Sequence, residues 1–222
     1  MKVFLVGASG GVARRAAVLL IGRGDTVTGM HRRPEQSRTV ADTGAVPVLG
    51  DLVADTVEEL AAKMDGHDAV VFSAGAHGAG AEQTTLIDGK GVEKAAEAAS
   101  QVGATQFVLV SAFPDSERAA GLGEGFEHYI RVKKGAEIFL TRTDLDWLVV
   151  RPGNLRDEPG DGLVTAGLVL YESPVRRDNV AQFIVEALHS ADLTRTIVEI
   201  TDGQTPVAEA VAQVARSLGP RD

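Results

Sequence analysis

Short runs of β-branched and other apolar residues alternate along the chain with longer stretches in which apolar positions recur every three to four residues. The first apolar run covers residues 3–6, and it is followed by a helix-like stretch at 12–21 and a second run at 26–30. The short runs are typical of buried strands, and the longer stretches are typical of amphipathic helices. The N-terminal part of the chain is therefore predicted to form a β-α-β unit.

The same alternation continues to the end of the chain. We expect further strands at residues 47–49, 69–72, 107–110, 147–150 and 197–200, and further helices at about 82–102, 129–140 and 179–188. A terminal helix carries Val207, Val211, Val214 and Leu218 on one face. Strands that alternate with helices pair in parallel and are covered on both faces, so the pattern predicts an α/β fold with a doubly wound parallel sheet.

The pattern changes after Arg151-Pro152-Gly153. Residues 154–164 are rich in glycine, proline and acidic residues and are predicted to form a loop. This loop is the best candidate for a segment that covers a substrate. We expect residues 1–222 to form a single domain, in which residues from about 154 onward contribute a small C-terminal cap on the substrate side.

The first strand ends in a glycine-rich turn, Gly7-Ala8-Ser9-Gly10-Gly11-Val12-Ala13, that leads directly into a helix. Gly7 permits the tight turn, and Gly10 has no side chain to keep a pyrophosphate away from the amides of the helix N-terminus. This succession of strand, turn and helix predicts a dinucleotide site of Rossmann type. The residues expected to contact the dinucleotide here are Gly7, Ser9, Gly10, Gly11 and Val12. The alternative is a glycine-rich connection with no ligand.

The second strand is followed by Arg32 and Arg33, where a site that prefers NAD(H) would usually place an acidic residue. Guanidinium groups present several fixed donors to an anion and suit the 2′-phosphate of the other dinucleotide. The sequence therefore favours NADP(H) over NAD(H). A solvated basic turn with no ligand is the alternative.

Composition narrows the class of protein further. A net charge of −9 disfavours broad contact with nucleic acid, since such binding normally rests on a basic face. The chain has no cysteine, which removes disulfides and thiolate chemistry and fits a reducing cytoplasm. No apolar stretch approaches the roughly 18 residues of a membrane span. We expect a cytoplasmic monomer or homodimer that acts on a small-molecule substrate, with no membrane or nucleic acid partner.

Several further segments follow the predicted strands and helices in a recognisable order. They are Gly50-Asp51-Leu52, Ser73-Ala74-Gly75-Ala76, Asp88-Gly89-Lys90-Gly91, Ser111-Ala112, Tyr129-Ile130-Arg131-Val132-Lys133, Arg151-Pro152-Gly153-Asn154-Leu155 and Arg176-Arg177-Asp178-Asn179-Val180-Ala181. With the glycine turn, they resemble the atypical short-chain dehydrogenase/reductases with an NAD(P)H-binding domain, a group also called NmrA-like or sugar-epimerase-like. The resemblance spans nearly the whole chain.

The resemblance implies a set of cofactor contacts. Asp51 and Leu52 correspond to the element that holds the adenine, and the turn after the fourth strand lines the cofactor. The further positions that the resemblance assigns to the cofactor are Ser73, Ala74, Gly75, Lys133, Pro152, Asn154 and Leu155. Asp88 stands where relatives carry an asparagine, and this departure puts a proton relay through its helix in doubt.

Tyr129 and Lys133 are four residues apart on a predicted helix, so their side chains share one face. A nearby ammonium stabilises a tyrosinate and makes a tyrosine a better acid or base near neutral pH. The resemblance implies that Tyr129 moves the proton on a carbonyl or hydroxyl, while Ser111 orients the same oxygen and Lys133 also holds the nicotinamide ribose. The alternative is a partly buried aromatic residue beside a solvated lysine.

Other nearby groups are given lesser roles. Lys134 is a weaker candidate than Lys133, because only the latter shares the face of Tyr129 well. His128 is interpreted as a surface residue, and His77 lies in a glycine-rich loop from which it could reach a substrate or simply be exposed. No cluster has the spacing of metal ligands.

Residues 112–128 contain Asp115, Glu117, Glu124 and Glu127 and are predicted to form a mobile acidic flap, which disfavours a strongly anionic substrate. The first hypothesis for function is an NADP(H)-dependent oxidoreductase that acts on a small carbonyl or quinone-like substrate. One alternative is a protein that senses NADP(H) without catalysis. Another is a sugar epimerase or dehydratase-like isomerase, which would need a larger substrate pocket than the short cap suggests.

Overall fold

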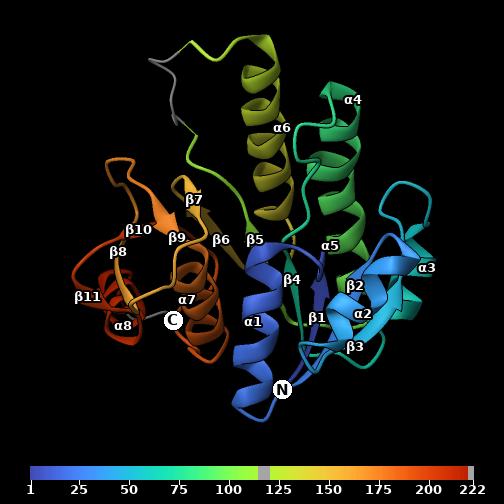
Figure 1. The fold of residues 1–222 in the computed structure, drawn as a ribbon, viewed down its shortest axis with the longest axis horizontal. Coiled ribbons are helices and arrows are strands. Elements are labelled where there is room, and N and C mark those ends of the chain that lie inside the picture. The colour runs from blue at the N-terminus through green and yellow to red at the C-terminus, as the bar shows by residue number, and fades with distance from the viewer. Residues whose placement is uncertain (115–120, 220–222) are drawn as a thin grey trace.

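The computed structural model describes residues 1–114 and 121–219 (Figure 1). Within these ranges, nine strands form one sheet in the order β11-β8-β10-β6-β5-β4-β1-β2-β3. They are β1 (Lys2–Val6), β2 (Thr26–His31), β3 (Val46–Leu49), β4 (Ala69–Phe72), β5 (Gln106–Val110), β6 (Asp146–Pro152), β8 (Leu163–Gly167), β10 (Thr196–Asp202) and β11 (Thr205–Pro206). A separate pair joins β7 (Leu155–Arg156) to β9 (Val175–Arg176). The predicted α/β class with a doubly wound sheet is confirmed.

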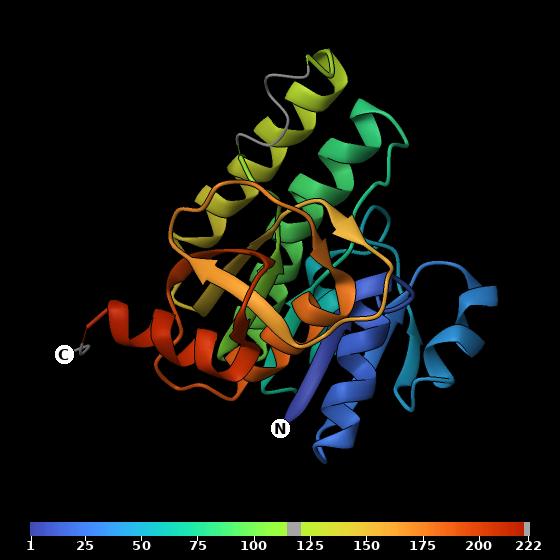
Figure 2. The ribbon, with the colours of Figure 1, turned by 60° about the vertical axis from the view of Figure 1, so that its left-hand side comes forward.

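Helices cover both faces of this sheet (Figures 1 and 2). One face carries α1 (Gly11–Gly22), α2 (Ser37–Ala41), α7 (Arg177–Leu188) and α8 (Val207–Ser217), and the other carries α3 (Val57–Met64), α5 (Gly91–Gln101) and α6 (Glu124–Leu140). Shorter elements are η1 (Pro34–Gln36), α4 (Ala81–Thr84) and the π-helical turn η2 (Thr85–Lys90). In the part of the chain that the structure describes, no helix is long and apolar enough to cross a membrane.

The alternation of side chains along β1 explains how the sheet is covered twice. Val3 and Leu5 belong to the hydrophobic cluster beneath α1 and α7, whereas Phe4 and Val6 belong to the cluster beneath α3, α5 and α6. All four side chains are fully buried. Successive residues of a strand point to opposite faces, so a continuous apolar run is what a strand with helices on both sides requires.

The strand order places a topological switch point between β1 and β4. The chain proceeds from β1 to β2 and β3 in one direction, and then from β4 to β5 and β6 in the other. Ligands of open α/β sheets bind in the crevice outside the carboxyl ends of the strands at such a point. The glycine turn follows β1, and residues 73–77 follow β4, so both lie at this crevice.

Several predicted boundaries are wrong. The helix expected at residues 129–140 begins at Glu124, so Glu124, Glu127 and His128 belong to α6 and not to a flap. Asp115 and Glu117, the other acidic residues of the expected flap, lie outside the described residues. The long helix expected at 82–102 contains the π-helical turn η2. The sheet is not wholly parallel, because β8 runs antiparallel to both β10 and β11.

The sequence analysis also missed local elements. Two strands, β7 and β8, fall partly or wholly within the segment expected to be a loop after residue 154. Glycine and acidic residues made that segment look irregular. The helices α2 and α3 were not expected either, although Thr56 and Glu59 form a capping box at the start of α3 that marks its beginning.

Candidate functional site

The glycine turn packs directly against the segment that follows β4. Gly7 has a φ of +80°, and a Cβ atom at this position would lie 2.7 Å from the Cα of Ala74. Gly10 donates a backbone hydrogen bond to the carbonyl oxygen of Gly7 at 2.9 Å, which closes the turn. Helix α1 then begins at Gly11 with no side-chain cap and no acidic residue in its first turn. The first turn of α1 thus brings no negative charge of its own to the crevice.

Two adjoining cavities open at this crevice. A cavity of about 400 Å³ is lined by Gly7 and Ser9 together with Arg32, Arg33, Asp51 and Leu52. A second cavity of about 530 Å³ contains Gly11 and Val12. Both are lined by Gly10 and by residues 73–77, so Ser73, Ala74 and Gly75 lie where the two cavities meet. Together they form one elongated groove across the switch point.

The end of the groove that carries Arg32 and Arg33 is basic and solvent-exposed. Arg33 pairs with Glu35 through Nε and Oε1 at 3.2 Å, and its backbone N–H donates to Gln36. Across the groove, Asp51 accepts a hydrogen bond from the backbone N–H of Val53 at 2.8 Å. This end therefore offers guanidinium donors on one side and a held carboxylate on the other.

Ser111, Tyr129 and Lys133 all line the other end of the groove. Ser111 follows β5 and is fixed by its backbone N–H, which donates to the carbonyl oxygen of Val150 at 2.7 Å. Its Oγ is buried and has no hydrogen-bond partner among the described residues. A buried hydroxyl without a partner is costly, so this atom is available to a group that the described residues do not supply.

Tyr129 and Lys133 lie on successive turns of α6, as their spacing predicts. The Nζ of Lys133 lies 5.7 Å from the centre of the Tyr129 ring, and it donates to the carbonyl oxygen of Val110 at 3.2 Å. The tyrosine is half-buried, whereas the lysine is almost fully buried. The ammonium thus sits beneath the tyrosine and next to the strand that precedes Ser111.

Asp88 is the buried partner of Lys133. Its Oδ1 lies 3.3 Å from Nζ, at ion-pair distance although not aligned as a hydrogen bond, and its Oδ2 accepts from the backbone N–H of Ala76 at 2.9 Å. Burial opposes the charge of Lys133, but attraction to Tyr129, Asp88 and Glu137 outweighs it, so the pKa of the lysine is raised. Lys133 is therefore a permanent cation at neutral pH.

Asp88, which stands where relatives carry an asparagine, therefore has a structural role. The side chain of Asp88 belongs to the π-helical turn η2, and such turns often occur at functional sites. It links the ammonium of Lys133 to the loop after β4, which lines both halves of the groove. The sequence signal for this buried partner was an acidic residue directly after Leu86 and Ile87 in a predicted helix.

A smaller cavity of about 280 Å³ lies beyond Tyr129. It shares Ser111, Phe126, Tyr129, Leu155 and Arg177 with the groove and adds Phe113. Two of the residues that the resemblance assigned to the cofactor, Pro152 and Asn154, line this smaller cavity rather than the groove. Leu155, the third cofactor residue predicted in this segment, lines both the smaller cavity and the groove.

The remaining candidate residues are placed as follows. His77 is exposed, has a φ of +49° and lines both halves of the groove. His128 is not a free surface residue, because its Nε2 lies 2.9 Å from Thr85 Oγ1 and the ring is half-buried. Lys134 lines neither of the two cavities that contain Tyr129. No group of three or more metal-ligating side chains occurs in residues 1–114 and 121–219.

Sequence analysis did not single out two charged groups near the site. Arg177, the first residue of α7, lines both the groove and the cavity beyond Tyr129. Arg151 is held by Glu137 of α6 through hydrogen bonds of 3.1 and 2.6 Å, and lies 3.5 Å from Glu199 of β10. This buried cluster joins α6 to the sheet directly below Lys133. Neither contact has a local sequence signal, because the partners are far apart in the chain.

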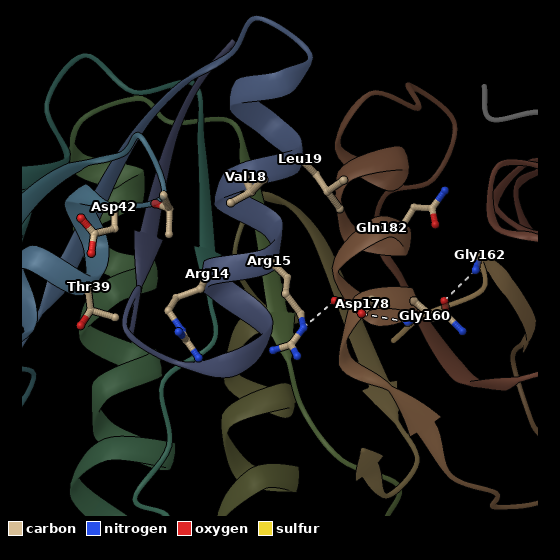
Figure 3. Close-up of a pocket in the computed structure, with 12 residues that line it drawn as sticks. Arg14, Arg15, Val18, Leu19, Thr39, Asp42, Gly160, Gly162, Asp178 and Gln182 are labelled. Carbon is tan, nitrogen blue, oxygen red and sulfur yellow. Dashed lines mark hydrogen bonds and ion pairs between the residues drawn. The ribbon is translucent and has the colours of Figure 1, made fainter. Parts of the chain in front are cut away.

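A further cavity, of about 690 Å³, lies elsewhere, on the outer side of α1 (Figure 3). Arg14, Arg15 and Asp42 line it, but the glycine turn and Ser111, Tyr129 and Lys133 do not. Figure 3 shows Arg15 reaching across to Asp178, whose other oxygen accepts from the backbone N–H of Gly160 at 2.8 Å. Size alone therefore does not identify the functional site.

The groove has the features that a dinucleotide requires. The turn is made of glycines that bring the backbone close, the N-terminus of α1 is uncapped, and Ser111 Oγ has no partner within the described residues. These features lie at the switch point of a doubly wound sheet. Fold and site together define a dinucleotide-binding protein of Rossmann type.

The chain belongs to the family whose model is described as NAD(P)H-binding, which matches residues 7–191. It is 36% identical over 216 residues to an uncharacterised sugar epimerase of Bacillus subtilis, with 96% of this chain and 100% of that protein covered. The resemblance to atypical short-chain dehydrogenase/reductases is confirmed.

Solved structures agree with this assignment. A Bacillus halodurans protein, named only provisionally as an NAD-dependent epimerase/dehydratase, has a TM-score of 0.87 and 32% identity, with 96% of this chain and 100% of that chain covered. An oxidoreductase from Lactococcus lactis has a TM-score of 0.87 and 25% identity, with 100% of both chains covered. The names of these relatives thus divide between oxidoreductase and epimerase.

Proposed function

We propose that this protein is an NADP(H)-dependent oxidoreductase that acts on a small carbonyl or quinone-like substrate. The observation that carries the proposal is the convergence of Ser111, Tyr129 and Lys133 on the end of the groove that continues from the glycine turn. The Oγ of Ser111, which has no partner among the described residues, supports a substrate oxygen beside it. The family supports a nicotinamide dinucleotide as the ligand of the groove.

Each residue has a defined task in this proposal. The cofactor supplies or accepts the hydride. In the reducing direction, Tyr129 donates its hydroxyl proton to the carbonyl oxygen as the carbonyl carbon gains the hydride, so a carbonyl becomes an alcohol. Ser111 donates a hydrogen bond to the same oxygen, and Lys133 stabilises the tyrosinate that remains until solvent returns the proton. Asp88 keeps Lys133 in place and charged.

The cavity beyond Tyr129 sets the size of the substrate. Its volume of about 280 Å³ is at the lower end of ligand pockets, and Phe113 and Phe126 make its lining partly aromatic. Pro152 and Asn154 border it from the other side, which supports a role for residues from about 154 onward as a substrate-side cap. A small planar acceptor matches this space.

The direct test is oxidation of NADPH in the presence of aldehydes, ketones and quinones. We expect turnover with at least one class of acceptor, and a loss of at least about 100-fold in kcat for Tyr129→Phe, because general acid catalysis contributes that much. Tyr171→Phe is the matched control, since Tyr171 is 98% exposed. Absence of turnover with every acceptor, or equal activity of the two variants, would refute the proposal.

The preference for NADP(H) has its own test. Arg32→Ala should raise the Kd for NADPH about tenfold and change the Kd for NADH little, because only the former carries the 2′-phosphate that a guanidinium binds. Arg38→Ala serves as the control, since Arg38 is exposed and lies outside the groove. An equal effect of Arg32→Ala on both dinucleotides would contradict the assignment.

A sugar epimerase is the second candidate, and the names of the relatives from the two Bacillus species favour it. Epimerisation through a transient ketone would use the same serine, tyrosine and lysine but return the cofactor unchanged. Incubation with nucleotide-sugars distinguishes the two functions. Formation of an epimer by the protein supplied with NADP⁺, without net formation of NADPH, supports the epimerase, and stoichiometric oxidation of NADPH by a small carbonyl acceptor in a parallel assay supports the reductase.

A further inference from the structure

Arg177 occupies a place that no part of the proposed chemistry uses. It is the first residue of α7, and its side chain lies across the start of α1, where a Cβ atom on Gly11 would come within 2.7 Å of its Cδ and 3.0 Å of its Nε. It also lines the groove. Gly11 thus leaves room for an arginine that arrives from a helix far away in the chain.

The partner of this guanidinium is weakly held. Nη1 of Arg177 pairs with Oδ2 of Asp157 at 3.0 Å and donates to the carbonyl oxygen of Leu155 at 3.3 Å. The Asp157 side chain is 75% exposed, whereas that of Arg177 is 25% exposed. Ion pairs with an exposed partner contribute little to stability, so a ligand anion can replace Asp157 at small cost.

Arg15, a second arginine near Asp157, has other partners. Arg15 also lies near Asp157, at 3.6 Å, but its Nε is bound to Asp178 and its Nη1 donates to the carbonyl oxygen of Gly11. Arg15 lines the outer cavity and not the groove. Arg177 is therefore the guanidinium that lies beside the uncapped start of α1 in the groove.

We propose that Arg177 binds the diphosphate of the dinucleotide, beside the N-terminus of α1, and that the diphosphate takes the place of Asp157. A guanidinium from α7 and backbone amides from α1 would then hold the same anion from two sides. Release of Asp157 would free the segment that carries it, which begins at Leu155 beside the cavity beyond Tyr129. Cofactor binding would in this way be coupled to the wall of the substrate cavity.

The proposal rests on dinucleotide binding by this family and not on the proposed reaction, so it is tested by affinity without turnover. Isothermal titration calorimetry with NADPH would compare the wild type with Arg177→Ala, Asp157→Ala and Arg156→Ala. Arg156 is the matched control, because it is an exposed arginine that neighbours Leu155 and lines neither half of the groove. The probe 2′-AMP, which has no diphosphate, reports on the adenosine end alone.

We expect Arg177→Ala to raise the Kd for NADPH about tenfold, as loss of a charge-assisted hydrogen bond does, and to leave the Kd for 2′-AMP unchanged. Asp157→Ala should lower the Kd for NADPH about threefold, because a competing carboxylate is gone. Arg156→Ala should change neither. The opposite signs of the two main variants exclude a general loss of folding as the explanation.

Three results would overturn the proposal. The first is an Arg177→Ala variant whose affinity for NADPH equals that of Arg156→Ala. If such a variant loses turnover only with carboxylate-bearing acceptors, Arg177 binds an anion of the substrate instead. The second is an equal loss of affinity for NADPH and 2′-AMP, which indicates a distorted groove. The third is an Asp157→Ala variant that does not bind NADPH more tightly than the wild type, which would show that the diphosphate does not replace Asp157 at Arg177.

Discussion

Substitution of Asp88 by asparagine isolates the charge that faces Lys133. Asparagine has nearly the same shape, and its side-chain oxygen can still accept the hydrogen bond from Ala76 N–H. What is lost is the negative charge 3.3 Å from the ammonium, in a place where the two side chains are 1% and 7% exposed. The variant therefore leaves a buried cation without its nearest counter-charge.

The size of the effect follows from this geometry. Two unit charges separated by this distance attract by about 5 kcal/mol at an effective dielectric constant of about 20. Removal of one partner from a buried pair typically costs about 3–5 kcal/mol in the free energy of unfolding. Lys133 keeps its bond to Val110 O and the attraction of Glu137, so we expect a value near the lower limit, about 3 kcal/mol at pH 7.

The pH dependence gives the sharper test. In the wild type the pKa of Lys133 is raised, so its stabilising contribution is fully present below the unfolded pKa and is lost as pH rises through the folded pKa. In Asp88→Asn, one of the attractions that offset burial is lost, so we expect the pKa of the lysine to be lower than in the wild type. The deficit in unfolding free energy relative to the wild type should then shrink between pH 7 and pH 9.5, as the variant's lysine loses its proton at a lower pH.

Urea unfolding followed by circular dichroism at these two pH values measures the deficit. Glu93→Gln is the control, because it makes the same chemical change in the exposed Lys90–Glu93 pair nearby and should alter the unfolding free energy by about 0.5 kcal/mol or less. The reasoning fails if Asp88→Asn costs no more than Glu93→Gln, or if its deficit is the same at both pH values.

Two further substitutions test the frame of the site. Gly7→Ala should lower the unfolding free energy by about 1–3 kcal/mol more than Gly66→Ala, and it should weaken NADPH binding. Both glycines have a positive φ, but only a Cβ atom at Gly7 would meet a backbone atom at 2.7 Å. Equal costs for the two variants would contradict this reasoning. Glu137→Gln should cost about 3 kcal/mol in urea unfolding, because it leaves the half-buried Arg151 with only the more distant Glu199. Asp42→Asn changes an exposed pair and should cost little, so comparable values for the two variants would contradict the role of Glu137.

The parts of the site that could be predicted from the sequence are those fixed by local geometry. The turn after β1 could be predicted as a dinucleotide-binding turn, because the glycines that such a turn needs, Gly7 and Gly10, lie within one short segment. Tyr129 and Lys133 could be paired because the helical repeat alone brings them to one face. Where the relation between residues is set by one turn or one helix, spacing in the chain is equivalent to spacing in the structure.

Contacts that depend on the assembled sheet could not be found in this way. Arg177 meets Gly11 only because α7 packs beside α1, and Asp88 meets Lys133 only because η2 packs against α6. The start of α6 was misplaced for a related reason. Its acidic residues made the segment look like a mobile flap, although Glu124 and Glu127 suit the positive end of a helix whose N-cap is Gly123, with a φ of +86°.

The choice between reductase and epimerase depends on the space beside Tyr129 more than on Tyr129 itself. Ser111, Tyr129 and Lys133 would serve a ketone equally well whether it is the final substrate or an intermediate. A nucleotide-sugar must place its sugar at Ser111 Oγ and its nucleotide somewhere beyond, yet the cavity there has about 280 Å³ and is lined by Phe113 and Phe126. Drug-sized ligands occupy pockets of roughly 300–1,000 Å³. The available volume therefore favours a small acceptor that receives the hydride and leaves.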